Sequence, residues 1–230
     1  MEKAPTERAP LSPLFIVVTA VFITALISAN IIAVKLVVIF GEVLPAAIVI
    51  FPISYIVGDV LTEVYGFRRA RAVIWLGFLC NLLAVGAFWV GGLLPAAGFW
   101  QENEAAYETI LGQTPRILAA SLAAYLVGEL ANSMVLSRMK QATKGRWLWS
   151  RTIGSTVVGQ GLDSAVFITI AFAGDVPDLW RLVWVQWLAK VAYEVLATPL
   201  TYAVVSELKR RERTDAYDWG TSLNPLRFWR

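Results

Sequence analysis

The sequence predicts an all-α integral membrane protein, a bundle of six transmembrane helices. Hydrophobic residues make up 57% of the 230 residues and charged residues only 16%, and the mean hydropathy is +0.61, which lies outside the range of soluble globular domains. The apolar runs lack the polar–apolar alternation that a membrane barrel requires. Runs long enough to cross a bilayer as helices occur at about 14–35, 43–65, 72–94, 116–136, 152–173 and 182–205.

Basic residues are distributed unevenly among the predicted loops. If the N-terminus is cytoplasmic, 16 of the 20 Lys and Arg residues lie in cytoplasmic segments, namely the two tails and the loops after the second and fourth helices. Only Lys35, Arg116 and Arg181 lie outside, and Lys190 falls within the sixth helix. Because short cytoplasmic loops accumulate Lys and Arg, both termini are expected to be cytoplasmic. Clusters confined to helix ends do not indicate a nucleic-acid partner.

The expected organisation is a transmembrane domain at 14–206 between cytoplasmic tails at 1–13 and 207–230. The first apolar run is longer than the core of a signal peptide, so no cleavage is expected. The charged C-terminal tail is expected to be flexible. The single Cys80 excludes an internal disulfide, and the absence of histidine makes a Cys/His metal site untenable, so neither a metal nor a cofactor is predicted.

The first helix carries Ala25, Ala29 and Ala33 at four-residue intervals. Such a stripe of small residues serves either internal helix packing or the docking of a partner membrane protein. Asn30, toward the outer end, indicates a polar outer vestibule, whereas Lys35 either contributes to that vestibule or extends to the interface.

The second helix brings two carboxylates into the membrane. Asp59 and Glu63 are four residues apart and therefore share one helix face. An ionised carboxylate facing lipid is costly, so both must face the protein interior, a water-filled cavity or a cationic partner. Pro52 is expected to interrupt this helix within the membrane, at a simple kink or beside a binding site.

The next two helices differ in polarity. The third has Asn81 as its one strongly polar interior residue and is expected to be scaffold. Residues 95–115 are expected to include a short amphipathic helix, over the outer mouth or as an interfacial connector. The fourth helix adds a buried carboxylate, Glu129, with Asn132 near it.

Polar residues then occupy one face of each of the last two helices. The fifth helix aligns Thr156, Gln160, Asp163 and Ser164. The sixth places Gln186, Lys190 and Glu194 at four-residue steps, with Tyr193 beside them.

These groups sort by depth into two layers. The outer layer consists of Asn30, Gln160, Asp163, Gln186, Lys190 and Glu194. The inner layer, which is suited to close as an ion-paired gate, consists of Asp59, Glu63, Glu129, Asn132 and Arg151. Because each intramembrane ionisable group costs a few kcal/mol to insert, the whole set favours a transport path with a site and a gate. The alternative is that Lys190 forms a structural pair with Glu194 or Asp163 while the amides join helices.

Other functions fit less well. An intramembrane aspartyl protease would need Gly-x-Gly-Asp, but Ile56 replaces the first glycine before Asp59. The chain shows no histidine, nucleophile motif or phosphate-binding loop, so no enzyme is predicted. A channel is possible in principle, but no filter motif is evident.

The pattern Phe51-Pro52-x-x-Tyr55-x-x-Gly58-Asp59-x-x-x-Glu63-x-Tyr65-Gly66, followed by Arg151-Thr152-x-x-Ser155, Gln160 and Asp163-Ser164, resembles the queuosine precursor transporters, also called the vitamin uptake transporter family. The resemblance covers about 14–206 and includes Asn30 and Lys35 in the first helix and Glu129 and Asn132 in the fourth. It implies uptake of 7-cyano-7-deazaguanine or its aminomethyl derivative across the bacterial cytoplasmic membrane for tRNA modification. The family also resembles the substrate-binding components of energy-coupling-factor transporters, which leaves an energising membrane partner or a homodimer open.

With that substrate class in view, the expected site lies between the fifth and sixth helices. A deazaguanine would donate two hydrogen bonds to Asp163, and Gln160 or Gln186 would pair with its ring carbonyl. Lys190 would pair with the same carbonyl or neutralise Asp163 when the site is empty, and Tyr193 or a nearby Phe would stack on the ring. Asn30, Lys35 and Glu194 complete the predicted substrate-binding set.

Overall fold

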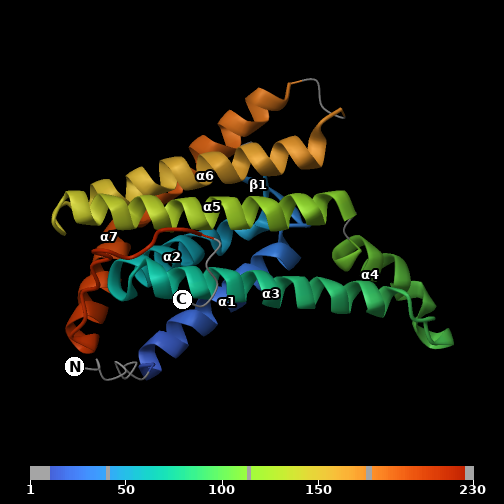
Figure 1. Cartoon of the computed structure of the whole chain (residues 1–230). Helices are drawn as coiled ribbons and strands as arrows, with labels where there is room; N and C mark the ends of the chain where they lie inside the picture. The colour runs from blue at the N-terminus through green and yellow to red at the C-terminus, as the bar shows by residue number, and fades with distance from the viewer. Residues whose placement is uncertain (1–10, 40–41, 113–114, 175–177, 226–230) are drawn as a thin grey trace.

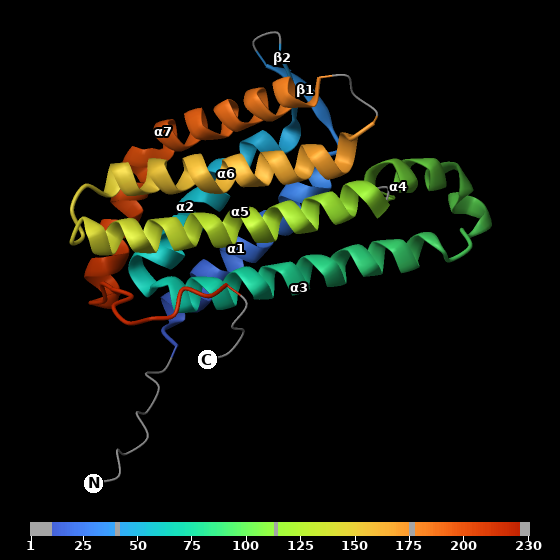
Figure 2. The same ribbon diagram turned by 45° about the horizontal axis from the view of Figure 1, so that its top comes forward.

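A computed structural model describes residues 11–39, 42–112, 115–174 and 178–225. Long helices lie side by side along one direction, with a small hairpin and a short helix at one end (Figures 1 and 2). The elements are α1 (Pro13–Ile32), β1 (Leu36–Ile39), β2 (Glu42–Pro45), the 3-10 turn η1 (Ala46–Val49), α2 (Phe51–Tyr65), α3 (Phe67–Gly92), the 3-10 turn η2 (Gly98–Asn103), α4 (Glu104–Leu111), α5 (Pro115–Ala142), α6 (Leu148–Phe172) and α7 (Leu179–Glu212).

Each of the six predicted helices is present, as α1, α2, α3, α5, α6 and α7, and the prediction of an all-α membrane protein is confirmed. Within the described residues, five helical segments, each containing one of these helices other than α2, are long and apolar enough to cross a membrane. We call the end of the bundle where α2, α5 and α7 finish the basic end, because the arginines after α2 and the Lys and Arg residues that end α7 lie there. The opposite end, with the hairpin and α4, is called the distal end.

The second helix is shorter than predicted. It was expected over 43–65, but β2 pairs antiparallel with β1, from Leu36 opposite Pro45 to Ile39 opposite Glu42, and α2 has only 15 residues. β-Branched valine and isoleucine favour this extended pairing. Pro52 lies in the first turn of α2, where its missing N–H costs nothing. The prediction that Pro52 interrupts the helix is therefore wrong.

Local signals explain where several helices begin and end. The Ser12 side chain caps α1 by accepting a hydrogen bond from the amide of Phe15 at 3.0 Å, and Asp178 caps α7 in the same way through Arg181. Between α2 and α3 the chain turns at Gly66, whose φ of 84° favours glycine. Because no residue separates the two helices except Gly66, α3 starts directly against the end of α2.

α2 is the innermost helix. From Tyr55 to Phe67 every residue is buried except the half-buried Val57. α2 packs against α1, α3, α5 and α7, and its apolar face joins a core that includes Phe22, Val60 and Leu61. The two carboxylates of α2 therefore lie inside the protein rather than against lipid.

α5 and α6 approach each other closely at two glycines. A Cβ on Gly128 would lie 2.7 Å from the Cβ of Asp163, and a Cβ on Gly159 would lie 2.6 Å from the Cβ of Asn132. Distances that short do not occur between real side chains, so both positions require glycine. This contact fixes the depth at which Asp163 and Asn132 face the interior.

The small residues of α1 face inward. Ala25 and Ala29 are buried, and Ala29 and Ala33 line a cavity described below. The stripe therefore packs inside the bundle, the first of the two alternatives that the sequence left open.

The segment after α7 folds back onto the basic end, seen as the red stretch beside the start of α3 in Figure 2. Asp218 accepts hydrogen bonds from the amide of Phe67 at 3.1 and 3.0 Å and from Ser137 at 2.5 Å. Arg71 donates to the carbonyl of Asn224 at 2.5 Å. The expectation of a flexible tail is wrong for residues 213–225, because a carboxylate 151 residues away supplies the N-terminal cap that Gly66 cannot give α3.

Candidate functional site

A cavity of about 200 Å³ lies between α1, α2, α5, α6 and α7, and we call it the polar cavity. It is smaller than the roughly 300–1,000 Å³ of typical small-molecule sites, which suits a compact ligand. Aromatic rings of Phe22, Tyr55, Tyr125 and Phe167 border it. Its remaining polar lining residues are Asn30, Ser54, Ser121, Glu129, Gln160, Asp163, Gln186 and Lys190.

An ion pair crosses this cavity. Lys190 of α7 donates a hydrogen bond from Nζ to Oδ2 of Asp163 on α6. Both side chains are partly accessible, 11% for Lys190 and 20% for Asp163. Gln186, one turn before Lys190, has a buried Oε1 without a hydrogen-bond partner among the described residues. The cavity therefore offers a carboxylate, an ammonium group and an unused amide oxygen to a ligand.

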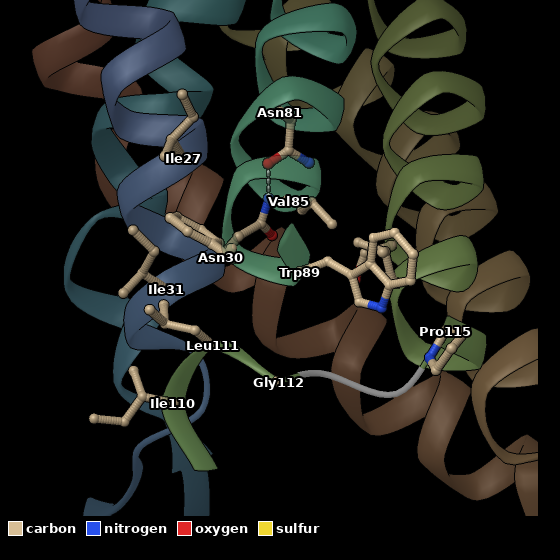
Figure 3. Close-up of a pocket in the computed structure, with 13 residues that line it drawn as sticks. Ile27, Asn30, Ile31, Asn81, Val85, Trp89, Ile110, Leu111, Gly112 and Pro115 are labelled. Atoms are coloured by element: carbon tan, nitrogen blue, oxygen red, sulfur yellow. Dashed lines mark hydrogen bonds between the residues drawn. The ribbon is translucent and has the colours of Figure 1, made fainter. Parts of the chain in front are cut away.

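A larger cavity of about 540 Å³ lies between α1, α3, α4 and α5, and Figure 3 shows its lining. Asn30 donates to Oδ1 of Asn81 at 2.9 Å on one side of it, and apolar side chains such as Trp89 and Leu111 form most of the rest. Asn30 and Ser121 line both cavities. A polar substrate would find few partners here, so the polar cavity is the better candidate site.

Below the polar cavity, toward the basic end, lies a layer of buried oxygens. Asp59 of α2 and Glu194 of α7 are 1% and 0% exposed. Asn132 of α5 donates to Oδ1 of Asp59 at 3.1 Å. In the described part of the chain, no cation lies within ion-pair distance of either carboxyl group, which sets this layer apart from the ion pair above it.

A cluster of five charged residues follows at the basic end, and we call it the basic-end cluster. Glu63 is fully buried, and its Oε1 accepts from Arg151 and from Lys209 at 2.7 Å each. Lys140 lies 3.5 Å from the same oxygen and 2.5 Å from Asp215, which Lys209 also contacts at 2.8 Å. Three cations thus face two carboxylates, and the cluster joins α2, α5, α6, α7 and the C-terminal segment.

Asp215 lies outside the membrane-spanning helices and shows how strongly this cluster holds its carboxylates. Partial burial raises the pKa of Asp215, but hydrogen bonds from Lys140 and Lys209 outweigh that effect, and the pKa lies below its usual value. Asp215 is therefore ionised throughout the physiological range and contributes a fixed negative charge.

A family model described as "Putative vitamin uptake transporter" matches residues 45–204, which include α2, α3, α5, α6 and most of α7. The chain belongs to the vitamin uptake transporter family. It is accordingly a multi-pass membrane transporter and not an enzyme. The polar cavity and the layer of buried oxygens lie mainly within the matched residues, as do Glu63, Lys140 and Arg151 of the basic-end cluster.

Individual relatives agree with this membership. A Bacillus subtilis (strain 168) protein named "Probable queuosine precursor transporter" is 33% identical over 193 residues, which cover 83% of this chain and 84% of the relative. The Escherichia coli (strain K12) "Queuosine precursor transporter" is 30% identical over 122 residues, 53% of this chain and 52% of the relative. No solved structure matches the transporter.

The structure brings together most of the outer layer predicted from the sequence. Asn30, Gln160, Asp163, Gln186 and Lys190 all line the polar cavity. Their roles in the transporter stay predictions, but their side chains share one space.

Three predicted substrate-binding residues lie elsewhere. Lys35 is exposed, in the turn before β1, and Tyr193 is half-buried on α7; neither appears among the residues that line the polar cavity. Glu194 is buried one turn beyond Lys190, in the layer with Asp59 rather than in the cavity wall.

The predicted inner layer is divided among three places in the transporter. Arg151 and Glu63 do form an ion pair. Glu129, however, lines the polar cavity, with its carboxylate against α2, 3.3 Å from where a Cβ on Gly58 would lie. Asn132 binds Asp59.

Sequence reasoning did not include several groups of these sites. Ser54, Ser121, Tyr125 and Phe167 border the polar cavity. Tyr55 does as well, and it stands in the motif that carries the family resemblance, which was an available signal. The cluster residues Lys140 and Lys209 were counted only among the basic residues of the loops, and Asp215 was not singled out. Nothing in their local sequence shows that they turn inward.

Proposed function

We propose that this transporter imports a deazapurine precursor of queuosine, 7-cyano-7-deazaguanine or its aminomethyl derivative, through the polar cavity. The observation that carries the proposal is the Lys190–Asp163 pair facing a small cavity that also holds Gln160 and Gln186. The names of the relatives point to the same substrate class.

The chemistry of the cavity suits one face of a guanine-like ring. A carboxylate accepts two parallel hydrogen bonds from an amino group and an adjacent ring N–H, and an amide or ammonium group donates to a ring carbonyl. Asp163 would supply the first contact, and Gln160, Gln186 or Lys190 the second. Phe167 lies one turn from Asp163 on α6 and lines the cavity, so it is the proposed stacking partner in place of Tyr193.

In this proposal Lys190 is the partner that the substrate replaces. When the cavity is empty, Lys190 neutralises Asp163. A substrate that binds Asp163 takes over part of that role, and Lys190 moves to the ring carbonyl. The pair is then both a recognition element and a way to keep a carboxylate inside the membrane at tolerable cost.

We also propose that the basic end faces the cytoplasm of a bacterial inner membrane, with the basic-end cluster as the inner gate. The basic residues at that end support this orientation. In a Cys80→Ser background, Ala105→Cys should react with a membrane-impermeant thiol reagent in intact cells, and Lys144→Cys should react only after lysis. The reverse labelling would contradict the orientation.

The test of the substrate is uptake of labelled precursor into cells that lack their own transporter. Asp163→Asn replaces one acceptor by a donor, which should weaken binding by about 1–3 kcal/mol, roughly 5- to 150-fold. Because Lys190 loses its partner in that variant, the double variant Asp163→Asn/Lys190→Gln removes both charges together and should also fail to transport while remaining folded.

Glu207→Gln is the matched control, since Glu207 pairs with Arg210 and Arg211 on the surface of the basic end and should leave uptake unchanged. Normal uptake by either Asp163 variant would refute the recognition role of Asp163. Absence of precursor uptake by the unmodified transporter would refute the proposed substrate.

A further inference from the structure

We propose that Asp59 and Glu194 form a proton-binding site and that the transporter couples substrate import to proton entry. The coupling rests on the proposed function, whereas the proton site rests on the arrangement of the buried oxygens alone. The site lies between the polar cavity and the basic-end cluster, on the two helices α2 and α7 that pack against each other.

The layer holds acceptor atoms without donors. Oδ2 of Asp59, Oδ1 of Asn132 and both carboxyl oxygens of Glu194 are buried and have no hydrogen-bond partner among the described residues. Nδ2 of Asn132 donates to Oδ1 of Asp59, and the other side-chain oxygens of the layer receive no hydrogen bond from the described residues. A protonated carboxyl group is a donor, so protons on Asp59 and Glu194 supply what these oxygens lack.

The charges around the layer do not compensate its carboxylates. Glu194 exerts the strongest repulsion on Asp59, followed by Glu129 and Glu63. An isolated buried carboxylate costs several kcal/mol, and two facing each other cost more, whereas two neutral acids avoid that cost.

The helices around the layer place no balancing cation beside it among the described residues. α1 carries no ionisable side chain from Pro13 to Ile32. On α3, Cys80 is half-buried and uncharged in its thiol form, Arg68 is exposed, Arg69 lies over the ring of Phe15, and Arg71 binds the C-terminal segment.

Several cations on the other helices face other acids, whereas Arg116 of α5 donates to the carbonyl oxygens of Ile170 and Ala173. On α7, Lys190 pairs with Asp163. Arg151 of α6, Lys140 of α5 and Lys209 of α7 face Glu63. Tyr55 lies near Glu194 and Tyr125 near Glu129, and a tyrosine hydroxyl is not a cation. In the described part of the chain, the layer is thus left to protons.

The position of the pair suits transfer between the two sides. Glu129 lines the polar cavity and lies against α2 at Gly58, the residue before Asp59, so Glu129 is the group proposed to pass a proton from cavity water to Asp59. Glu63 is one turn from Asp59 toward the basic end. When the basic-end cluster opens, cytoplasmic water and the cluster cations reach Asp59, its O–H bond breaks, and the proton leaves to that water.

A sodium ion is the competing occupant. With two carboxylates it would leave a net negative charge in the layer, and no group of three or more acidic, Cys or His residues suited to a metal ion occurs among the described residues. A proton on each carboxyl group leaves the layer without net charge.

The first test uses purified transporter and does not depend on the substrate. Infrared spectroscopy at neutral pH should show the carbonyl band of a protonated carboxylic acid, and Asp59→Asn and Glu194→Gln should each reduce it. Glu207→Gln should leave it unchanged. Absence of the band, or a band of undiminished intensity in the Asp59→Asn/Glu194→Gln double variant, would overturn the proton site.

The second test uses proteoliposomes loaded with buffer and given labelled precursor outside. If one proton accompanies each substrate, equilibrium accumulation should rise about tenfold for each unit by which the outside is more acidic. Asp59→Asn should abolish that dependence. Accumulation that does not change with the pH difference, or that rises with a sodium gradient at constant pH, would overturn the coupling. A transporter that takes up no precursor refutes the proposed function, and the infrared result then still decides the proton site.

Discussion

Replacing Glu63 by glutamine tests the charge balance of the basic-end cluster. Glu63 is 0% exposed, and its carboxylate accepts hydrogen bonds of 2.7 Å from Arg151 and from Lys209. Arg151 is itself only 1% exposed. With Asp215 the cluster has three cations and two anions, so Glu63→Gln leaves three cations against one. Removing one partner of a buried ion pair costs about 3–5 kcal/mol, since the remaining charge is left uncompensated.

The expected effect is large enough to read as a melting temperature in detergent. At about 2–4 °C per kcal/mol for a chain of this size, Glu63→Gln should lower the midpoint by about 6–20 °C. Lys209→Gln has the opposite effect on charge, because it leaves two cations against two anions. Lys209 is 24% exposed, so its loss should cost only about 1 kcal/mol or less.

A double variant tests the charge balance a second time. Glu63→Gln/Lys209→Gln restores the excess of one cation and should recover part of the lost stability, which a double-mutant cycle measures directly. Arg210→Gln, at a surface pair, is the control and should melt like the unmodified protein. A Glu63→Gln midpoint within about 2 °C of the control, or a Lys209→Gln loss as large as that of Glu63→Gln, would refute the account.

Two further predictions concern packing. Gly159→Ala places a Cβ 2.6 Å from the Cβ of Asn132 and should destabilise the protein by about 1–3 kcal/mol. Gly86→Ala is the control, because a Cβ there has nothing within 4 Å, and it should be neutral or slightly stabilising. Equal melting temperatures of the two variants would contradict the close contact. Asp218→Ala removes the hydrogen-bond acceptor for Phe67 and Ser137 and should release the C-terminal segment. Trypsin should then cleave faster after Arg213. Unchanged cleavage would show that other contacts are enough to hold the segment in place.

Hydropathy was sufficient for the long helices and insufficient for α2. The lipid-facing surfaces of α1 and α3 are long and apolar, and a long apolar run is the signal that a spanning helix requires. Residues 43–50 are equally apolar, but they form a strand and a 3-10 turn. A run that is apolar on every side has no periodicity to distinguish strand from helix, so the start of α2 was not predictable from it.

The fold of the C-terminal segment was hidden for a different reason. Its charges are typical of a flexible tail, yet Asp215 and Asp218 bind residues 75–151 positions earlier in the chain. Those contacts depend on where the ends of α3 and α5 lie in space. The local sequence predicts neither the capping of α3 by Asp218 nor the contacts of Lys140 in the basic-end cluster.

The candidate site was predictable as a set of faces but not as a set of partners. Lys190 and Glu194 are four residues apart and share one face of α7. In the structure that face meets α6 at Lys190, where Asp163 compensates the charge. It then meets α2 at Glu194, where no cation of the described residues does so. Helical periodicity gives the face of a helix, whereas the crossing of helices decides which neighbour each turn meets.

The same division occurs on α2, where three cations compensate Glu63, whereas none among the described residues compensates Asp59, one turn away. On both helices the uncompensated carboxyl group lies in the same layer, between a paired site and a paired gate. The sequence alone places these acids in the membrane at similar cost. In the three-dimensional arrangement, Glu63 and Asp163 have cations beside them, whereas Asp59 and Glu194 have none among the described residues. The proposed roles of Asp163 in substrate recognition and of Asp59 and Glu194 in coupling rest on that difference.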